Sequence, residues 1–192
     1  KVDSREGLNT PPFGFVIDYL TYGGIYRDVW LYDKPAYFIK DVFVTTNTLD
    51  TVSVSIQTDG LVPIDSYQVK ILDSNGEIIA QQAVSINTRQ IQIPVKNIHA
   101  WTTESPTLYR CIVELGDDTF ATNFGFRTIR FDQNNLYIND QKVFLRGLNR
   151  HQCYPYIGYA AVDSLQEEDV RILKEELHVN AVRTSHYPQS QS

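Results

Sequence analysis

The chain has 192 residues, of which 42% are hydrophobic and 21% are charged, and its formal net charge is −6. This length allows one or two domains with cores of their own. The acidic balance argues against a nucleic-acid partner, which would require a basic face. No apolar run approaches the roughly 18 residues of a transmembrane helix, so a membrane-spanning class is excluded.

The two cysteines, Cys111 and Cys153, fall in segments that we assign to different domains. We therefore expect no disulfide framework, and two reduced thiols favour a compartment such as the cytoplasm. A periplasmic or secreted location stays open. No signal peptide is visible, but in a fragment that absence carries no information.

Residues 1–33 form the first of three predicted pieces. They contain an irregular aromatic stretch that ends at Gly23-Gly24, and Ile25 to Leu31 then alternate in the manner of a strand. So small a piece cannot hold a core alone, because isolated strand pairs are only marginally stable. We expect it to pack on a neighbour or to belong to a larger sheet.

Residues 34–128 are predicted to form an all-β domain. Short alternating runs recur at the spacing typical of a sandwich, for example Val52, Val54 and Ile56 between serines. Residues 73–76 (Asp-Ser-Asn-Gly) predict a hairpin, because Asn-Gly accepts positive φ. About seven strands in this length is the count of an immunoglobulin-like sandwich.

Residues 129–192 change the pattern. A hairpin at residues 139–142 precedes a predicted strand, 142–147, and a second strand is predicted at 179–182. A loop of roughly fifteen residues and a helix lie between these strands, and a loop of that length is more often functional than not. Strand, helix and strand in this order predict a βαβ unit with parallel strands, as at the opening of a (β/α) barrel.

The helix between the two strands is predicted to open with a capping box from Ser164 to Glu167. Val170, Leu173 and Leu177 form a stripe at helical spacing that would pack on the sheet. One βαβ unit does not close a barrel, so we expect these apolar side chains to lack part of their burial.

Polar side chains gather at the carboxyl ends of the two predicted strands. Asn149, Arg150 and His151 follow the first, and Arg183 and His186 follow the second. Such strand ends face the ligand crevice, and arginine with histidine suits the recognition of hydroxyl or carboxylate groups. The alternative is structural, with arginines in ion pairs and histidines capping carbonyl groups. Each residue alone fits that alternative better, whereas the set favours a site.

Other chemistries fit less well. Cys153 with His151 and His186 matches no common zinc pattern, and a cysteine in such a loop is more often an ordinary loop residue than a nucleophile. The acidic residues of this segment lie on the helix, where none can flank a substrate bond. The predicted site therefore contains binding groups and no catalytic carboxylate pair.

These motifs resemble glycoside hydrolase family 2. Residues 146–151 (RGLNRH) and 180–188 (NAVRTSHYP) carry the resemblance, and the second stretch is similar to the first sequence signature of that family. Residues 24–31 (GIYRDVWL) resemble the end of its amino-terminal jelly-roll domain. The resemblance to its immunoglobulin-like second domain rests on residues 101, 106–109 and 125–127.

The resemblance implies a mainly β fold class with three parts. Residues 1–33 would be the carboxyl-terminal strands of a jelly-roll sugar-binding domain, and residues 34–128 an immunoglobulin-like β-sandwich. Residues 129–192 would be the start of a (β/α)8 catalytic barrel, that is, the first βαβ unit of an incomplete TIM barrel.

The implied activity is that of a retaining exo-β-glycosidase that hydrolyses terminal β-D-galactosides in carbohydrate catabolism. Its two catalytic glutamates, about 5–5.5 Å apart in retaining enzymes, come from later barrel strands. They would lie beyond Ser192, so we expect this chain alone to be inactive. The residues after Asn149 resemble β-galactosidases more than β-glucuronidases, which are the alternative. A non-catalytic β-sandwich module, a spacer or carbohydrate binder, is the second alternative.

The resemblance also assigns residues by position. His151 and His186 match sugar-contacting histidines, Arg183 matches an arginine beside the nucleophile, and Asp18 matches an aspartate that the first domain projects toward the pocket. The expected substrate-binding set is Asp18, Asn149, Arg150, His151, Arg183 and His186.

The resemblance implies no cofactor or metal site in this chain, because the ligands for the Mg²⁺ or Na⁺ that family galactosidases often use would lie beyond Ser192. The expected partner is a β-galactoside, with no nucleic acid and no membrane. The full-length protein is expected to form a homo-oligomer.

Overall fold

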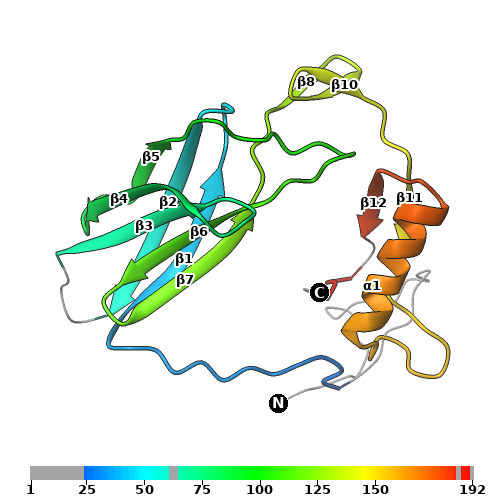
Figure 1. Cartoon of the computed structure of the whole chain (residues 1–192). Helices are drawn as coiled ribbons and strands as arrows, with labels where there is room; N and C mark the ends of the chain where they lie inside the picture. The colour runs from blue at the N-terminus through cyan, green and yellow to red at the C-terminus, as the bar shows by residue number, and fades with distance from the viewer. Residues whose placement is uncertain (1–23, 61–64, 185–186, 191–192) are drawn as a thin grey trace. The chain divides into compact units, whose positions relative to one another are not determined.

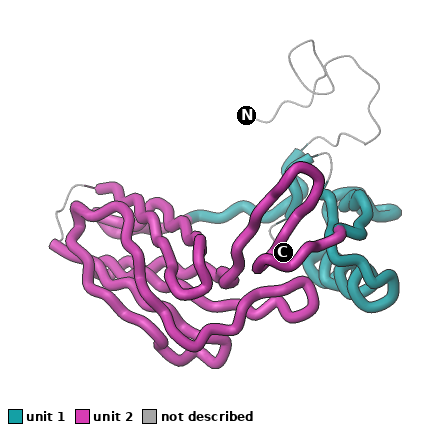
Figure 2. Tube along the Cα trace, turned by 90° about the horizontal axis from the view of Figure 1, so that it is seen from above, with its two compact units in different colours: residues 1–31, 145–192 teal, residues 32–144 magenta. Residues whose placement is uncertain are grey.

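The structure, a computed structural model, describes residues 24–60, 65–184 and 187–190. The chain divides into two compact units, which Figure 2 distinguishes by colour. Unit 1 contains residues 1–31 and 145–192, and unit 2 contains residues 32–144. Among the described residues, no helix is both long and apolar enough to cross a membrane.

The described part of unit 2 contains a β-sandwich of two antiparallel sheets (Figure 1). One sheet has the strand order β1-β2-β5 and the other has the order β4-β3-β6-β7. The bounds are β1 Tyr37–Thr45, β2 Thr51–Gly60, β3 Ser66–Leu72, β4 Ile78–Ser85, β5 Gln90–Pro94, β6 Tyr109–Leu115 and β7 Asp118–Phe124. The immunoglobulin-like sandwich that the sequence predicts is confirmed.

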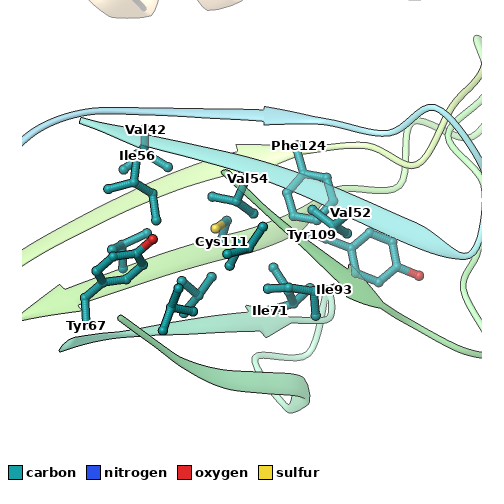
Figure 3. Packing of buried hydrophobic residues seen from close by; sticks show 14 of the residues in the cluster. Val42, Val52, Val54, Ile56, Tyr67, Ile71, Ile93, Tyr109, Cys111 and Phe124 are labelled. Carbon is teal, nitrogen blue, oxygen red and sulfur yellow. The ribbon is translucent and has the colours of Figure 1, made fainter. Parts of the chain in front are cut away.

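The sandwich core follows from the alternation of residues along each strand, because neighbouring side chains of a strand point to opposite faces. In β2, Val52 and Val54 are fully buried and Ile56 is 4% exposed. Figure 3 shows these side chains packed against others from both sheets, among them Ile71 and Cys111. Each such aliphatic side chain contributes roughly 1.5–3 kcal/mol through its removal from water.

Trp101 packs together with residues 125–127 (Gly-Phe-Arg) in unit 2. The Trp101 backbone N–H donates to the carbonyl oxygen of Phe126 at 2.8 Å. A side chain at Gly125 would place its Cβ 2.8 Å from Cβ of Trp101, so only glycine fits there. The Arg127 guanidinium lies 4.8 Å from the centre of the Trp101 ring. The buried Phe126 ring meets the Tyr109 ring edge to face at 4.8 Å.

Both hairpins predicted from the sequence are present. Between β3 and β4, Gly76 has φ of +84° and the Asp73 carboxylate accepts the backbone N–H groups of Asn75 and Glu77 at 2.9 Å. Within this Asn-Gly pair, Gly76 has a positive φ and Asn75 does not. The second hairpin belongs to a small sheet with the order β10-β9-β8. Its strands are β8 Ile129–Asp132, β9 Asn135–Ile138 and β10 Gln141–Val143.

Unit 1 contains the expected strand, helix and strand. The elements are β11 Gly147–Arg150, α1 Asp163–Arg171, the π-helix η1 Ile172–Glu176 and β12 Ala181–Thr184. The two strands pair in parallel, which confirms the βαβ prediction. The strand bounds were wrong, because both strands begin later than predicted. Residues 141–143 pair with β9 instead and are therefore not available to β11.

The predicted capping box of the helix is also corrected. The residue at the N-cap is Val162, and no side chain caps the first turn of α1. Val170 is 58% exposed and Leu177 is 54% exposed, while Leu173 is half-buried, which agrees with the expectation that these apolar side chains lack part of their burial. The helix continues as η1, and its wider turn changes the face on which residues after Arg171 lie.

The strand predicted at Ile25 to Leu31 is irregular in the structure. It pairs with no strand among the described residues, and Ile25, Val29 and Leu31 are exposed by 71%, 76% and 98%. Strand geometry depends on a hydrogen-bonded partner, so alternation alone does not produce it. The jelly-roll prediction otherwise rests on residues 1–23, which lie outside the described residues, as does Asp18.

Replacement of Ile71 by alanine tests the sandwich core. Ile71 is fully buried, so we expect Ile71→Ala to reduce the free energy of unfolding by roughly 2–5 kcal/mol. Ile78→Ala is the matched control, because Ile78 is 52% exposed, and its cost should stay below about 1 kcal/mol. Urea denaturation followed by circular dichroism measures both, and equal losses would contradict the packing described here.

The two cysteines should differ in reactivity. Neither forms a disulfide, as the sequence predicts, and burial raises the pKa of the Cys111 thiol to about 12, whereas Cys153 is exposed. Thiolate is the reactive form, so at pH 8 we expect Ellman's reagent to modify one thiol per native chain and two per denatured chain. Mass mapping should place the native modification on Cys153. Rapid modification of Cys111 in the native chain would show that the sandwich core is open.

Candidate functional site

The candidate site is built on the parallel pair β11 and β12. Their register places Gly147 opposite Ala181 and Asn149 opposite Arg183. A Cβ on Gly147 would lie 2.3 Å from the carbonyl oxygen of Ala181, so this approach requires glycine. Next to it, the Arg146 backbone N–H donates to the Asn180 side-chain oxygen at 2.7 Å. These contacts hold the two strands in register from their amino-terminal starts.

Alternation separates the polar residues of β11 into two faces. Leu148 and Arg150 share one face, and Asn149 projects from the other. Arg150 contacts α1, which lies beside β11 in Figure 1, so α1 marks the first face. Asn149 and its register partner Arg183 are both exposed on the face opposite α1. His151 follows directly after the end of β11.

Arg150 is held by a polar cluster on the helix side. Its Nε and Nη2 atoms donate to one carboxylate oxygen of Asp169 at 3.0 and 2.6 Å. Nη2 also donates to Gln166 at 2.6 Å and to the Tyr154 hydroxyl at 2.9 Å. Because Gln166 is only 3% exposed, the cluster fixes the end of β11 against α1. Burial, together with the hydrogen bond to Asp169, raises the pKa of the Tyr154 hydroxyl above its usual value.

His151 is linked to the loop that follows β12. Its imidazole meets the Tyr187 ring edge to face, with centres 5.9 Å apart. The Tyr187 hydroxyl accepts the backbone N–H of Gln152 at 2.7 Å, and the Tyr187 ring packs on Tyr159 at 4.3 Å. Gln152 and Tyr187 therefore connect the loop after β11 to the segment after β12.

The loop between β11 and α1 folds back on itself. Tyr154 and Gly158 exchange two backbone hydrogen bonds of 3.0 Å, and the turn between them places Tyr156 fully exposed at φ +70°. A tyrosine rarely adopts this left-handed conformation. The long loop that the sequence predicts is thus a compact turn tied to α1 through Tyr154.

The predicted site residues have different outcomes. Asn149 and Arg183 come together in register and His151 lies beside them, whereas Asp18 and His186 lie outside the described residues. That these residues contact a sugar stays a prediction for all of them. For Arg150, the structure also shows the ion pair with Asp169 that the structural alternative expected.

Sequence reasoning missed three residues that contact the loops of the site. Gln152 directly follows the first motif and Tyr187 lies within the second, but their link depends on a contact between segments 35 residues apart. Arg27 reaches the same loops from the beginning of the chain. Arg27 and Tyr187 lie within motif stretches and Gln152 directly follows one, and this proximity is the only signal in the sequence that could have drawn attention to them.

The described residues include no group of three histidine, cysteine or acidic side chains that could hold a metal ion. Use of Mg²⁺ or Na⁺ by the full-length protein stays a prediction. Unit 2 carries a separate groove of about 1000 Å³. Polar side chains such as Lys40, Asp59 and Arg89 line it together with Tyr37, and it contains none of the predicted site residues.

The fold and the strand-end residues define a β-sandwich followed by the opening of a (β/α) barrel. The family model "Glycosyl hydrolases family 2" matches residues 37–127, and "Glycosyl hydrolases family 2, TIM barrel domain" matches residues 129–192. The chain belongs to glycosyl hydrolase family 2. This confirms the family that the sequence motifs indicated.

Two similar proteins are named as β-galactosidases. That of Thermoanaerobacterium thermosulfurigenes is 39% identical over 98% of this chain and 29% of its own length. That of Thermoanaerobacter pseudethanolicus is 39% identical over 100% of this chain and 28% of its own length. The chain thus spans less than a third of the length of these relatives.

Similar solved structures include β-glucuronidases. The Bifidobacterium dentium enzyme complexed with coumarin-3-O-glucuronide matches with a TM-score of 0.74 and 23% identity, over 81% of this chain and 28% of that chain. At that identity the likeness shows the fold alone. The Ruminococcus gnavus enzyme in complex with D-glucuronic acid matches with a TM-score of 0.71 and 26% identity, over 82% of this chain and 27% of that chain.

Removal of the Asp169 carboxylate tests the helix-side cluster. We expect Asp169→Ala to destabilise unit 1 by roughly 2 kcal/mol, since hydrogen bonds to charged groups contribute about 1.5–3 kcal/mol. Hydrogen exchange should accelerate in α1 and β11. Glu168→Ala is the control, because Glu168 pairs with the exposed Arg171 and should cost less than about 0.5 kcal/mol. Similar effects of the two variants would show that the Arg150 cluster does not hold the helix.

Proposed function

We propose that this chain is part of a retaining exo-β-glycosidase that hydrolyses terminal β-D-galactosides. The observation that carries the proposal is the juxtaposition of Asn149 and Arg183 on the face opposite α1, with His151 beside them. The 39% identity to relatives named as β-galactosidases supports galactosides as the substrates.

The proposed role of these side chains is to bind sugar hydroxyl groups. An exposed guanidinium and an amide supply several donors at fixed positions, and the amide oxygen and a neutral imidazole also accept hydrogen bonds. The Arg183 charge further suits a position near a carboxylate nucleophile, whose negative charge it would stabilise. Asp18 and His186 join this set by resemblance alone.

Arg150 has a different proposed role. Its guanidinium binds Asp169, Gln166 and Tyr154, so its donors are directed at the helix. A sugar contact would require it to leave a cluster whose other members would then be poorly paired, which is costly for partly buried polar groups. We propose that Arg150 supports the end of β11 and that Asn149 and His151 make the sugar contacts.

Catalysis is proposed to depend on two glutamates outside this chain. In a retaining mechanism one carboxylic acid protonates the leaving group and the other carboxylate forms the covalent glycosyl intermediate. The chain alone should therefore bind sugar weakly and hydrolyse none. Homo-oligomer formation and any use of Mg²⁺ or Na⁺ are likewise proposals for the full-length protein.

A β-glucuronidase activity is the second candidate, supported by the likeness to the Ruminococcus gnavus β-glucuronidase at 26% identity. A sandwich that only binds carbohydrate is a third candidate, for which the polar groove beside Tyr37 would be the binding surface. These candidates differ in which substrate is cleaved and in which unit responds to sugar.

Hydrolysis by the full-length protein tests the proposal, with this chain assayed alongside it in a host that lacks its own β-galactosidase. Nitrophenyl β-galactoside should be cleaved by the full-length protein alone, with kcat/KM at least about tenfold above that for the β-glucuronide. Arg183→Ala should lower kcat by about a hundredfold. The exposed Arg110 supplies the control, and Arg110→Ala should leave the rate unchanged.

Each other outcome of this assay has a distinct meaning. Preferential cleavage of the glucuronide would replace galactosides as the substrates. Cleavage of neither substrate, with sugar-induced NMR shifts confined to the groove of unit 2, would favour the binding module. Turnover that co-purifies with the chain alone would contradict the assignment of catalysis to residues outside it.

A further inference from the structure

Gln152 is a buried polar residue whose hydrogen bonds come from separate segments of unit 1. It is 3% exposed and follows β11 by two residues. Its side-chain oxygen accepts from Arg27 Nη2 at 3.1 Å and from the Ser190 backbone N–H at 2.9 Å. Its own backbone N–H donates to the Tyr187 hydroxyl at 2.7 Å. A buried amide with these partners is constrained in position, because loss of any partner leaves a desolvated polar group.

Arg27 bridges the loops that follow the two strands. One end of its guanidinium donates to Gln152 after β11, and Nη1 donates to the Pro188 carbonyl oxygen after β12 at 2.8 Å. The planar guanidinium fixes the separation of these two acceptors, which a flexible ammonium group could not do. The guanidinium also lies 5.3 Å from the centre of the Tyr26 ring, which packs on Tyr159 at 5.7 Å.

The bridge reaches the candidate sugar site through Tyr187. Gln152 holds the Tyr187 hydroxyl, and the Tyr187 ring lies edge to face with the His151 imidazole. Displacement of Gln152 would therefore move the ring against which His151 packs. Arg27 itself has its donors directed at Pro188 and Gln152, which is the arrangement of a positioning residue.

We propose that Arg27 is a positioning residue of the sugar site: by bridging Gln152 and Pro188 it holds the two strand-end loops together and sets the orientation of His151. That the positioned site binds a sugar rests on the proposed function. The contact itself does not depend on that function, so it can be tested separately.

The first measurement is NMR of this chain without any sugar. In Arg27→Gln, the His151 ring protons should shift and their cross-relaxation with the Tyr187 ring should weaken, while the amide signals of unit 2 stay in place. Gln152→Leu should produce the same change. Gln152→Glu should preserve the wild-type pattern, because a carboxylate still accepts from Arg27 and Ser190. Arg171→Gln is the matched control, since Arg171 binds only exposed glutamates of the helix in the described structure.

The second measurement is the kinetics of the full-length protein on nitrophenyl β-galactoside. Arg27→Gln should raise KM about tenfold, as expected for the loss of a charge-assisted hydrogen bond, with kcat changed less than about twofold. The KM of the double variant Arg27→Gln with Gln152→Leu should be no higher than that of the more impaired single variant, since both substitutions remove the same bridge. Gln152→Glu should restore KM to within about twofold of wild type.

The proposal is overturned if the His151 signals of Arg27→Gln match those of wild type. It is also overturned if this variant loses the dispersed amide signals of unit 1 as a whole, because Arg27 would then be required for folding. Additive effects in the double variant would likewise exclude a shared bridge. If the wild-type protein cleaves no galactoside, the proposed function fails, and the NMR comparison still decides whether Arg27 positions His151.

Discussion

The close parallel approach of β11 and β12 is the constraint on which the candidate site depends. It exists because Gly147 has no side chain where the Ala181 carbonyl oxygen passes, at 2.3 Å from the position of a Cβ. The register that follows sets Asn149 beside Arg183. Two residues distant in the sequence thereby present their side chains on one face, as the proposed recognition of a sugar requires.

Two polar attachments stabilise this pair in different ways. On the helix side, Arg150 and Asp169 connect the strand end to α1, whereas the apolar Val170 and Leu177 remain exposed. At the loops, Arg27 and Gln152 connect segments that come after both strands. The alignment of the unit 1 site therefore rests largely on hydrogen bonds with strict geometry, while the sandwich of unit 2 is held by apolar packing.

The sandwich could be predicted from sequence because its information is local. Alternation of Val52, Val54 and Ile56 identifies a buried face, and the turn at Gly76 identifies a hairpin. The family and the parallel βαβ order were also available, because the motifs are contiguous. The strand bounds could not be predicted, since Val143 fits either a hairpin or a barrel strand in the sequence. Only its pairing with Leu136 assigns it to the hairpin.

The different roles of the residues in the site could be predicted from the sequence only in part. Alternation along β11 separates Arg150 from Asn149, so the two faces were present in the sequence once the strand bounds were known. The contact of Arg27 with Gln152 spans 125 residues and has no local pattern. The exposure of Val170 agrees with the expectation that a single βαβ unit leaves part of the apolar stripe uncovered, whereas helical spacing alone gives the face of a helix but not what covers that face.

The most direct test of this account is a crystal structure of the full-length protein with a galactose-derived inhibitor. Hydroxyl groups of the sugar should lie within hydrogen-bond distance of Asn149, His151 or Arg183, with Arg150 still bound to Asp169. A sugar bound away from the ends of β11 and β12, or an Arg150 that has left Asp169 to bind it, would contradict the account.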